Sequence, residues 1–210
     1  MTELVFILDR SGSMAGMESD TIGGFNALIE KQKKQEGEAF VSTVLFDTDM
    51  TVIHDRVPLD KVKPLTDKDY FVGGCTALLD AVGGAIHHIG NIHKYARRED
   101  VPEKTLFVIT TDGYENASCE YTYDRVKRMI EHEQTKYGWE FLFLGANIDA
   151  AKEAARIGID RHHASNYHCD EVGMAMNYAS VDRAVSSVRM GAPLMDDWKE
   201  EVEKDYNSRR

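Results

Sequence analysis

Three short polar segments carry the residues of this sequence that could do chemistry. They contain Asp9, Ser11, Ser13, Thr76 and Asp112. Two carboxylates and three hydroxyls make an all-oxygen donor set, which suits a hard divalent cation such as Mg²⁺ or Mn²⁺ and does not suit Zn²⁺. Two carboxylates at most balance the charge of such an ion. A coordination position is therefore left for water or for a carboxylate from outside the chain.

The elements around these segments place all three at one edge of a sheet. Residues 4–8 and 106–109 are continuous apolar runs, typical of strands buried on both faces in a parallel sheet. Residues 9–13 directly follow the first run and residues 111–113 follow the second, while residues 73–76 precede a helical pattern. Ligands of open α/β sheets bind beyond the carboxyl ends of the strands. We therefore expect the three segments to meet there.

The rest of the chain alternates between strand and helix patterns. Residues 40–46 and 51–57 are β-rich and separated by a short polar link, which predicts a hairpin and one antiparallel strand at the sheet edge. Further strands are predicted at 141–144 and, less regularly, within 162–168. Helical spacing of apolar residues predicts helices over about 17–35, 79–95, 126–137, 149–156 and 172–188. The pattern favours an α/β fold with an open, doubly wound, mostly parallel sheet and helices on both faces.

The three polar segments also resemble a known motif. Residues 9–13 match the DxSxS signature of the von Willebrand factor type A family. Residues 74–76 resemble the threonine loop of that family, and residues 111–113 resemble its aspartate loop. Together they resemble a complete metal-ion-dependent adhesion site, and the resemblance spans roughly residues 3–188. Taken singly, the serines could be helix caps and the threonine a helix-start residue.

The resemblance implies a Rossmann-like fold and a set of roles for the five side chains. Ser11 and Ser13 would bind the ion directly, whereas Thr76, Asp9 and Asp112 would bind it directly or through water. Members of the family use the open metal position to grip an acidic side chain of a partner protein, and most are not enzymes. The expected function is thus a metal-dependent protein-binding module.

An Mg²⁺-dependent phosphohydrolase on a related α/β sheet is the alternative, with Asp9 as nucleophile. A phosphotransferase of the haloacid dehalogenase type would need a second acid two residues later, where this chain has Ser11. It would also need a phosphate-binding lysine, and the three segments contain none. We therefore expect no enzymatic activity.

The amino-acid composition argues against some classes of partner and favours one cellular compartment. The 25 Lys and Arg against 36 Asp and Glu give a net charge of −11, which argues against nucleic acids and anionic membranes as partners. No run approaches the about 18 apolar residues of a membrane span, and we expect no signal peptide. The three widely spaced cysteines, expected to be buried small residues, fit a reducing compartment, so a cytoplasmic location is expected.

Several charged residues near the three segments allow two interpretations. Asp80 is either a second-sphere group of the metal or a first-turn carboxylate stabilised by the helix dipole. Asp47, like Asp49, is either a turn former or a group that approaches the metal edge. Glu115 and Asn116 either touch a ligand or lie in a solvated loop. Arg10 is expected to point outward.

Two groups of histidines and a charged tail complete the pattern. The histidines at 87, 88 and 93 are expected to be surface or core-edge residues rather than metal ligands. Those at 162, 163 and 168 form a loose cluster near a predicted strand, and a second metal site there is the alternative interpretation. Residues 1–190 are expected to form the von Willebrand-like domain and residues 191–210 a charged amphipathic tail helix. Leu194, Trp198 and Val202 would form its apolar stripe, docked on the chain's own domain or on a partner or second copy.

Overall fold

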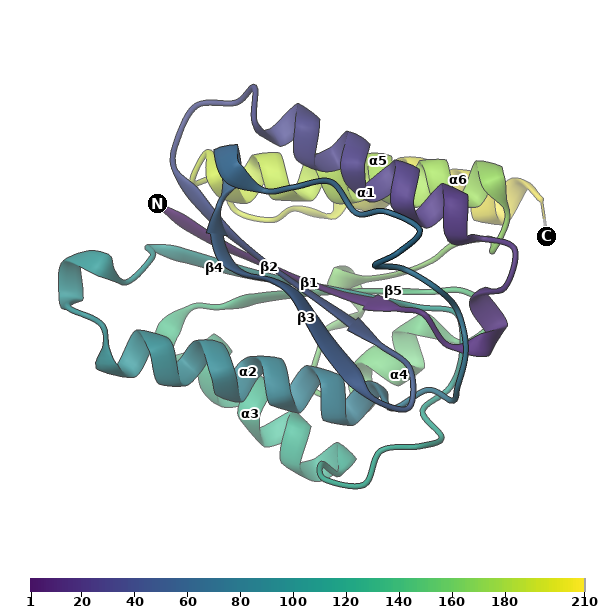
Figure 1. The fold of residues 1–210 in the computed structure, drawn as a ribbon, viewed down its shortest axis with the longest axis horizontal. Coiled ribbons are helices and arrows are strands. Elements are labelled where there is room, and N and C mark those ends of the chain that lie inside the picture. The colour runs from purple at the N-terminus through teal and green to yellow at the C-terminus, as the bar shows by residue number, and fades with distance from the viewer. Residues whose placement is uncertain (210) are drawn as a thin grey trace.

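A six-stranded sheet lies between two layers of helices in the computed structural model, which describes residues 1–209 (Figure 1). The strand order is β3-β2-β1-β4-β5-β6. The strands are β1 (Thr2–Asp9), β2 (Ala39–Phe46), β3 (Met50–Pro58), β4 (Lys104–Thr111), β5 (Glu140–Gly145) and β6 (Ala164–Asn166). Each neighbouring pair is parallel except β2 and β3. The mostly parallel sheet with one antiparallel edge strand is confirmed.

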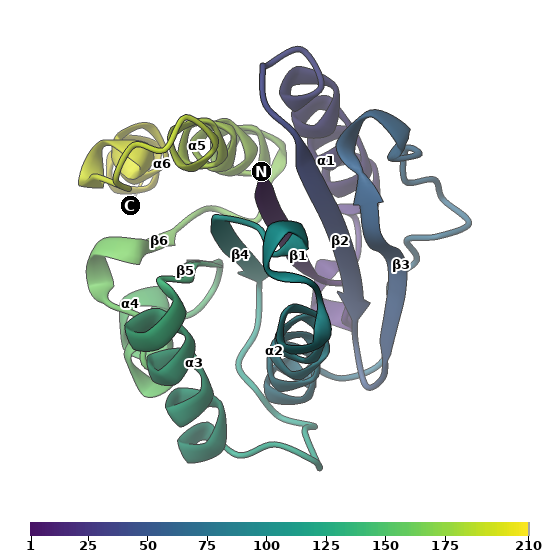
Figure 2. The same cartoon turned by 90° about the vertical axis from the view of Figure 1, so that its left-hand side faces the viewer.

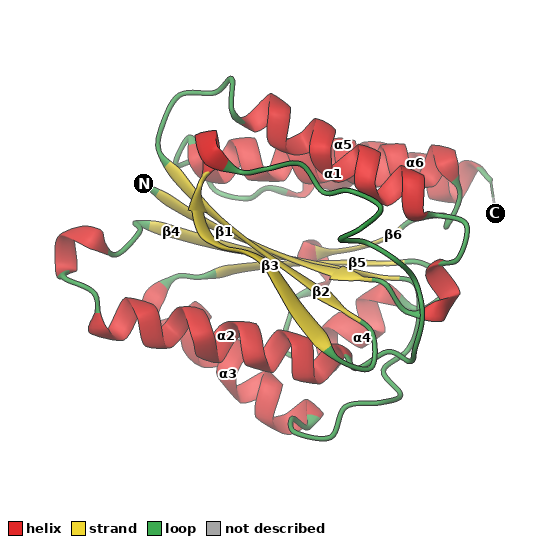
Figure 3. Cartoon of the chain, viewed as in Figure 1, coloured by secondary structure: helices red, strands yellow, loops and turns green. Residues whose placement is uncertain are grey.

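The helices divide between the two faces of the sheet (Figures 2 and 3). One face is covered by α1 (Glu18–Gln32), α5 (Glu171–Arg189) and α6 (Glu200–Ser208), and the other by α2 (Leu78–Tyr95), α3 (Tyr123–Tyr137) and α4 (Ala150–Arg156). Side chains alternate along β1, so Phe6 joins the first core while Ile7 joins the second. This burial on both faces explains why the strand is apolar throughout.

The chain changes winding direction between β1 and β4. From β1 it passes through α1 to β2 on one side, and after β3 it returns through α2 to β4 on the other side. Where the winding direction changes, the loops after two neighbouring strands run in opposite directions. A crevice forms between them at the carboxyl ends of the strands. Asp9 is the last residue of β1, and Asp112 directly follows β4. The fold therefore brings both carboxylates to this crevice.

The C-terminal residues pack on the chain itself. Trp198 lies in a short 3-10 helix (Asp196–Lys199), is 1% exposed, and donates from Nε1 to the carbonyl of His162 at 3.1 Å. Val202 on α6 is also fully buried, in the same core as Val181 of α5. The expected helix over 191–210 is therefore shorter than predicted, because Gly191 adopts a left-handed φ of 72° and residues up to 195 connect rather than continue the helix.

Within residues 1–209, every helix is too short or too polar to cross a lipid bilayer.

Candidate metal centre

Asp9 lies at the end of β1 with both carboxylate oxygens held. Its Oδ1 accepts a hydrogen bond from the backbone N–H of Ser11 at 2.7 Å, and its Oδ2 accepts one from Thr111 Oγ1 at 2.6 Å. The hydroxyl of Tyr70 donates to the Asp9 carbonyl at 2.5 Å. Asp9 itself is 2% exposed. The carboxylate is thus fixed at the crevice by groups from the loop after β1 and from β4, and the Asp9 backbone is held by the loop before α2.

Ser11, Ser13 and Asp112 form a chain of hydrogen bonds between the first and third loops. The two serine hydroxyl oxygens lie 3.1 Å apart, and Ser13 Oγ donates to Asp112 Oδ1 at 2.6 Å. Ser11 and Asp112 are buried, whereas Ser13 is exposed. The site therefore opens to solvent on the side of Ser13.

Thr76 borders the same space from the second loop. Its N–H donates to Asn116 Oδ1 at 2.9 Å, and the Asn116 N–H donates to the Thr76 carbonyl at 3.0 Å. A Cβ added at Gly113 would lie 3.5 Å from Thr76 Oγ1 and 3.6 Å from Ser13 Oγ. The two hydroxyls therefore border one small space beside Gly113, which a side chain at that position would fill.

Glycine at position 74 lets the second loop approach the first. Gly74 has a left-handed φ of 70°, and its carbonyl accepts a hydrogen bond from the Gly12 N–H at 3.2 Å. A Cβ there would lie 2.7 Å from Thr48 Oγ1, too close for any other residue without movement. Gly74 thus permits close approach to the β2–β3 turn, whereas a Cβ at Gly73 would meet nothing within 4 Å.

The electrostatics of the site favour a cation. Burial raises the pKa of the Asp9 carboxyl, and hydrogen bonds from Thr111 and Ser11 only partly oppose this. Burial also raises the pKa of Asp112, and the negative charge of Asp9 raises it further. A divalent ion between two such carboxylates offsets both their desolvation and their repulsion. The donor set, two carboxylates with three hydroxyls at one crevice, fits Mg²⁺ or Mn²⁺.

Arg10 does not point outward as expected. Its Nε lies 2.9 Å from Asp47 Oδ2, its Nη2 donates to Thr51 Oγ1 at 3.1 Å, and its guanidinium lies over the ring of Phe71. The residue is 6% exposed. Arg10 therefore braces the β2–β3 turn and the loop before α2 from behind the site. Asp47 does form the turn, since its Oδ1 accepts from the Asp49 N–H, and it also pairs with Arg10.

Asp80 and Glu115 organise the loop that follows Asp112. The carboxylate of Asp80 accepts three backbone N–H groups, from Cys119, Glu120 and Tyr121. Glu115 accepts from the N–H of Leu79 at the start of α2 and from N–H groups of its own loop. Neither acid is simply solvated. Their partners lie about 40 residues away or within a loop of irregular backbone, so no spacing in the sequence indicates them.

The cysteines are not the buried small residues that were expected. Cys75 and Cys119 are exposed and Cys169 is partly buried, because all three lie on loops or connections rather than in a core-facing element. The Cys169 thiol lies 3.9 Å from Asp112 Oδ2, and burial raises its pKa to about 11. Cys169 is therefore a neighbour of the candidate centre that the motif did not indicate.

The histidines do not assemble a second metal site. Across residues 1–209, no three His, Cys, Asp or Glu side chains are placed to hold an ion together. His87, His88 and His162 are exposed, while the His93 ring is mostly buried with Nε2 3.3 Å from Glu3 Oε2.

Comparison with known proteins identifies the fold. No family model and no curated protein sequence matches the chain. Among solved structures, the chain is similar to a point mutant of the PilB minor pilin from Streptococcus sanguinis, with a TM-score of 0.61 and 12% identity over 91% of this chain and 63% of that one. It is also similar to the ArnB paralog VWA2 from Sulfolobus acidocaldarius, with a TM-score of 0.56 and 16% identity over 88% and 44% of the two chains.

A third structure is described as a von Willebrand factor type A protein, from Catenulispora acidiphila. The TM-score is 0.55 and the identity 16%, over 87% of this chain and 42% of that one. The chain spans less than two thirds of each of these structures. It has the von Willebrand factor type A fold.

Proposed function

We propose that this chain binds a partner protein through a divalent cation, Mg²⁺ or Mn²⁺. The residues that would hold the ion are Asp9, Ser11, Ser13, Thr76 and Asp112. The observation that carries the proposal is the hydrogen-bonded chain from Ser11 Oγ through Ser13 Oγ to Asp112 Oδ1. It draws oxygen donors from two loops, 99 residues apart in the sequence, to one place at the crevice. When bound, the ion would accept a carboxylate from the partner as a further ligand.

The five donor residues would leave the bound ion able to attract a carboxylate from outside the chain. Only two of the five donors carry charge, so they at most balance the ion, and the hydroxyls add none. Ser13 is exposed, which leaves the crevice open to an approaching side chain. Phe71 and Tyr114 flank the second and third loops and are 56% and 51% exposed. Aromatic side chains are enriched in protein interfaces relative to the rest of the protein surface.

Binding rather than catalysis is proposed because the site lacks two groups that a phosphotransferase with an aspartate nucleophile needs. Ser11 stands where the second acid would be, and residues 9–13, 73–76 and 111–113 contain no lysine to bind a phosphate. The hydrogen bonds that both oxygens of Asp9 accept hold its carboxylate in place beside the proposed ion. Mg²⁺-dependent phosphohydrolysis is the outcome that would contradict this assignment.

An intracellular, cytoplasmic location is part of the proposal. Two of the three cysteines are exposed and none is paired within residues 1–209. Exposed free thiols persist in a reducing compartment and are oxidised elsewhere. Cell fractionation with an antibody against the chain tests this point, and recovery outside the cytoplasmic fraction would contradict it.

Capture from a native lysate tests the function. The immobilised chain is expected to retain a partner in Mg²⁺ and to release it in EDTA, and Thr76→Ala should abolish retention. Thr135→Ala, an exposed threonine on α3, is the matched control and should retain the partner. Equal retention in EDTA would place the working surface elsewhere. Hydrolysis of p-nitrophenyl phosphate that Asp9→Asn abolishes would instead favour the phosphohydrolase.

A further inference from the structure

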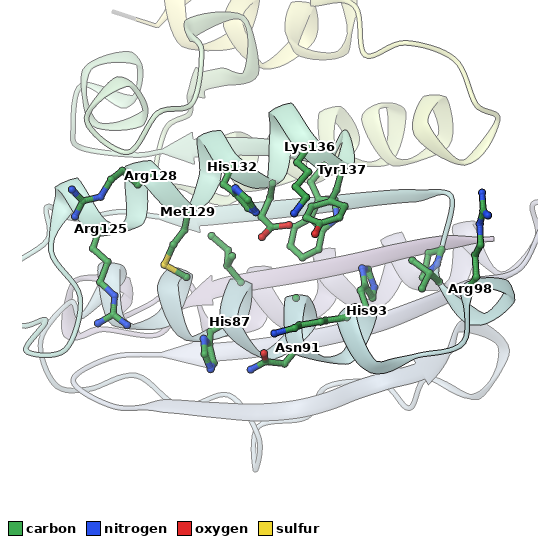
Figure 4. Close-up of a pocket in the computed structure, with 17 residues that line it drawn as sticks. His87, Asn91, His93, Arg98, Arg125, Arg128, Met129, His132, Lys136 and Tyr137 are labelled. Atoms are coloured by element: carbon green, nitrogen blue, oxygen red, sulfur yellow. The ribbon is translucent and has the colours of Figure 1, made fainter.

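A large groove runs between α2 and α3, separate from the metal centre. Figure 4 shows its lining side chains, with His87, Asn91 and His93 on one wall and His132 and Lys136 on the other. Its volume is about 1100 Å³, and it shares no residue with the candidate metal centre. Pockets for small ligands generally measure about 300–1000 Å³. The groove is therefore large enough for a segment of polypeptide.

The groove is basic, although the chain as a whole is acidic. It is lined by one carboxylate, Glu133, and by five permanent cations. The cations are Lys94, Arg98, Arg125, Arg128 and Lys136. The whole chain has 36 Asp and Glu against 25 Lys and Arg. The overall composition of the chain, which is acidic, therefore does not explain the excess of cations in this groove.

In the described part of the chain, the five cations have no carboxylate partner, although Arg125 donates to the Glu120 carbonyl at 3.2 Å and lies over the ring of Tyr121. None forms an ion pair with a carboxylate of residues 1–209. By contrast, two nearby basic residues that do not line the groove form ion pairs: Arg97 pairs with Asp100 at 2.7 Å and Lys127 with Glu131 at 3.9 Å. Like charges that line one groove repel each other, and an anionic ligand relieves that repulsion.

Between the cations the groove has an ordered, partly apolar base. Trp139 is 5% exposed, and its ring packs on Phe107 and against the edge of His93. His93 is in turn held by the fully buried Glu3 at 3.3 Å. Val101 and Met129 are partly buried in the lining and offer apolar surface. The base is therefore made of packed aromatic side chains, with aliphatic surface beside the charges.

We propose that this groove binds an acidic, amphipathic segment of a partner protein. Its carboxylates would pair with the five cations, and its apolar side chains would contact Val101 and Met129, as helix-in-groove recognition requires. A long polyanion such as nucleic acid would extend beyond the groove onto a surface of a chain with net charge −11 and be repelled. A short acidic segment covers the groove alone. This second surface needs no metal.

Fluorescence anisotropy with a defined peptide tests the proposal. The probe is a labelled peptide of roughly 16 residues in which Glu and Leu recur at helical spacing, titrated with the full chain in EDTA. The triple variant Lys94→Glu, Arg128→Glu, Lys136→Glu should weaken binding by at least about tenfold. All three residues are exposed, and unchanged thermal melting checks that the variant folds. Because EDTA is present, failure here leaves the metal-dependent function untouched.

The matched control is a second triple variant that makes the same change of charge outside the groove. Lys34→Glu, Lys61→Glu, Lys63→Glu makes an equal change at exposed positions outside the groove and should alter affinity by no more than about twofold. Equal loss in both triples would mean diffuse attraction and overturn the proposal, as would no binding by the unmodified chain. If single-stranded DNA binds as tightly as the peptide, and if the triple variant Lys94→Glu, Arg128→Glu, Lys136→Glu loses that binding, the groove would be assigned to nucleic acid. If sedimentation shows that the unmodified chain self-associates and that the groove variant does not, the groove would be assigned to a second copy of the chain.

Discussion

Ser13 Oγ donates a 2.6 Å hydrogen bond to Asp112 Oδ1, which joins the loop after β1 to the loop after β4. The two loops follow neighbouring parallel strands whose carboxyl ends meet where the sheet changes winding direction. An exposed hydroxyl and a buried carboxylate are thereby fixed relative to each other. The separation of the first and third loops, which sets the size of the proposed ion site, depends on this contact.

Asp112→Ala should remove metal binding without unfolding the domain. The variant loses one of two charged donors, so the affinity for Mg²⁺ or Mn²⁺ should fall by more than about tenfold. The fold should tolerate it, because the change also relieves the charge repulsion with Asp9 that raises the pKa of Asp112. Calorimetric titration measures the affinity, and thermal melting the stability. Asp67→Ala, an exposed carboxylate, serves as control. Unchanged metal affinity in Asp112→Ala would refute the site assignment.

Arg10 and Asp47 should be strongly coupled in a double-mutant cycle. Their side chains are only 8% and 15% exposed, and removing one leaves a poorly solvated charge. The cycle of Arg10→Met and Asp47→Asn, measured by urea unfolding, should give a coupling free energy of about 1–3 kcal/mol. The exposed pair Arg97 and Glu99, cycled with the same types of substitution, should give a value near zero. Additive effects for Arg10 and Asp47 would show that the pair does not brace the loops.

Trp198→Ala should destabilise the chain by about 3–5 kcal/mol, the usual cost of truncating a buried aromatic side chain. Trp198 is 1% exposed and also bonds to the His162 carbonyl. Met195→Ala, at a position 63% exposed, should change the free energy of unfolding by less than about 0.5 kcal/mol. Deleting the residues after Pro193 should likewise lower the melting temperature. A deletion that leaves melting unchanged would mean that the tail serves another partner.

Adjacent glycines of α1 should respond in opposite directions to alanine. A Cβ at Gly24 would lie 2.2 Å from Cδ2 of Tyr178 on α5, so Gly24→Ala should destabilise by about 1–3 kcal/mol. A Cβ at Gly23 meets nothing within 4 Å, so Gly23→Ala should stabilise by about 0.5–1 kcal/mol through helix propensity. Chemical unfolding of both variants measures the difference. Equal effects would mean that α1 and α5 do not pack this closely.

The strands and helices, and the short segments directly attached to them, could be predicted from the sequence. The apolar run at 4–8 and the alternating strand and helix patterns correctly predicted the parallel sheet, and the polar link before Met50 predicted the antiparallel edge. The five proposed ligands were identified because each stands in a short segment tied to the end of a strand or the start of a helix. Such patterns are local, since side-chain periodicity follows from the geometry of one element. That these residues bind an ion stays a prediction.

Only the tertiary structure decided the contacts between elements. Arg10 turns inward because Asp47 and Thr51 lie on the neighbouring hairpin, about 40 residues away. The groove is basic because the fold places the cations of α2, α3 and Arg98 on facing walls, although the chain is acidic. Trp198 is buried on its own chain because α5 and the short 3-10 helix before β6 (Arg161–His163) present a complementary surface. Each depends on sheet order and crossover direction, which bring distant segments together and which no local periodicity encodes.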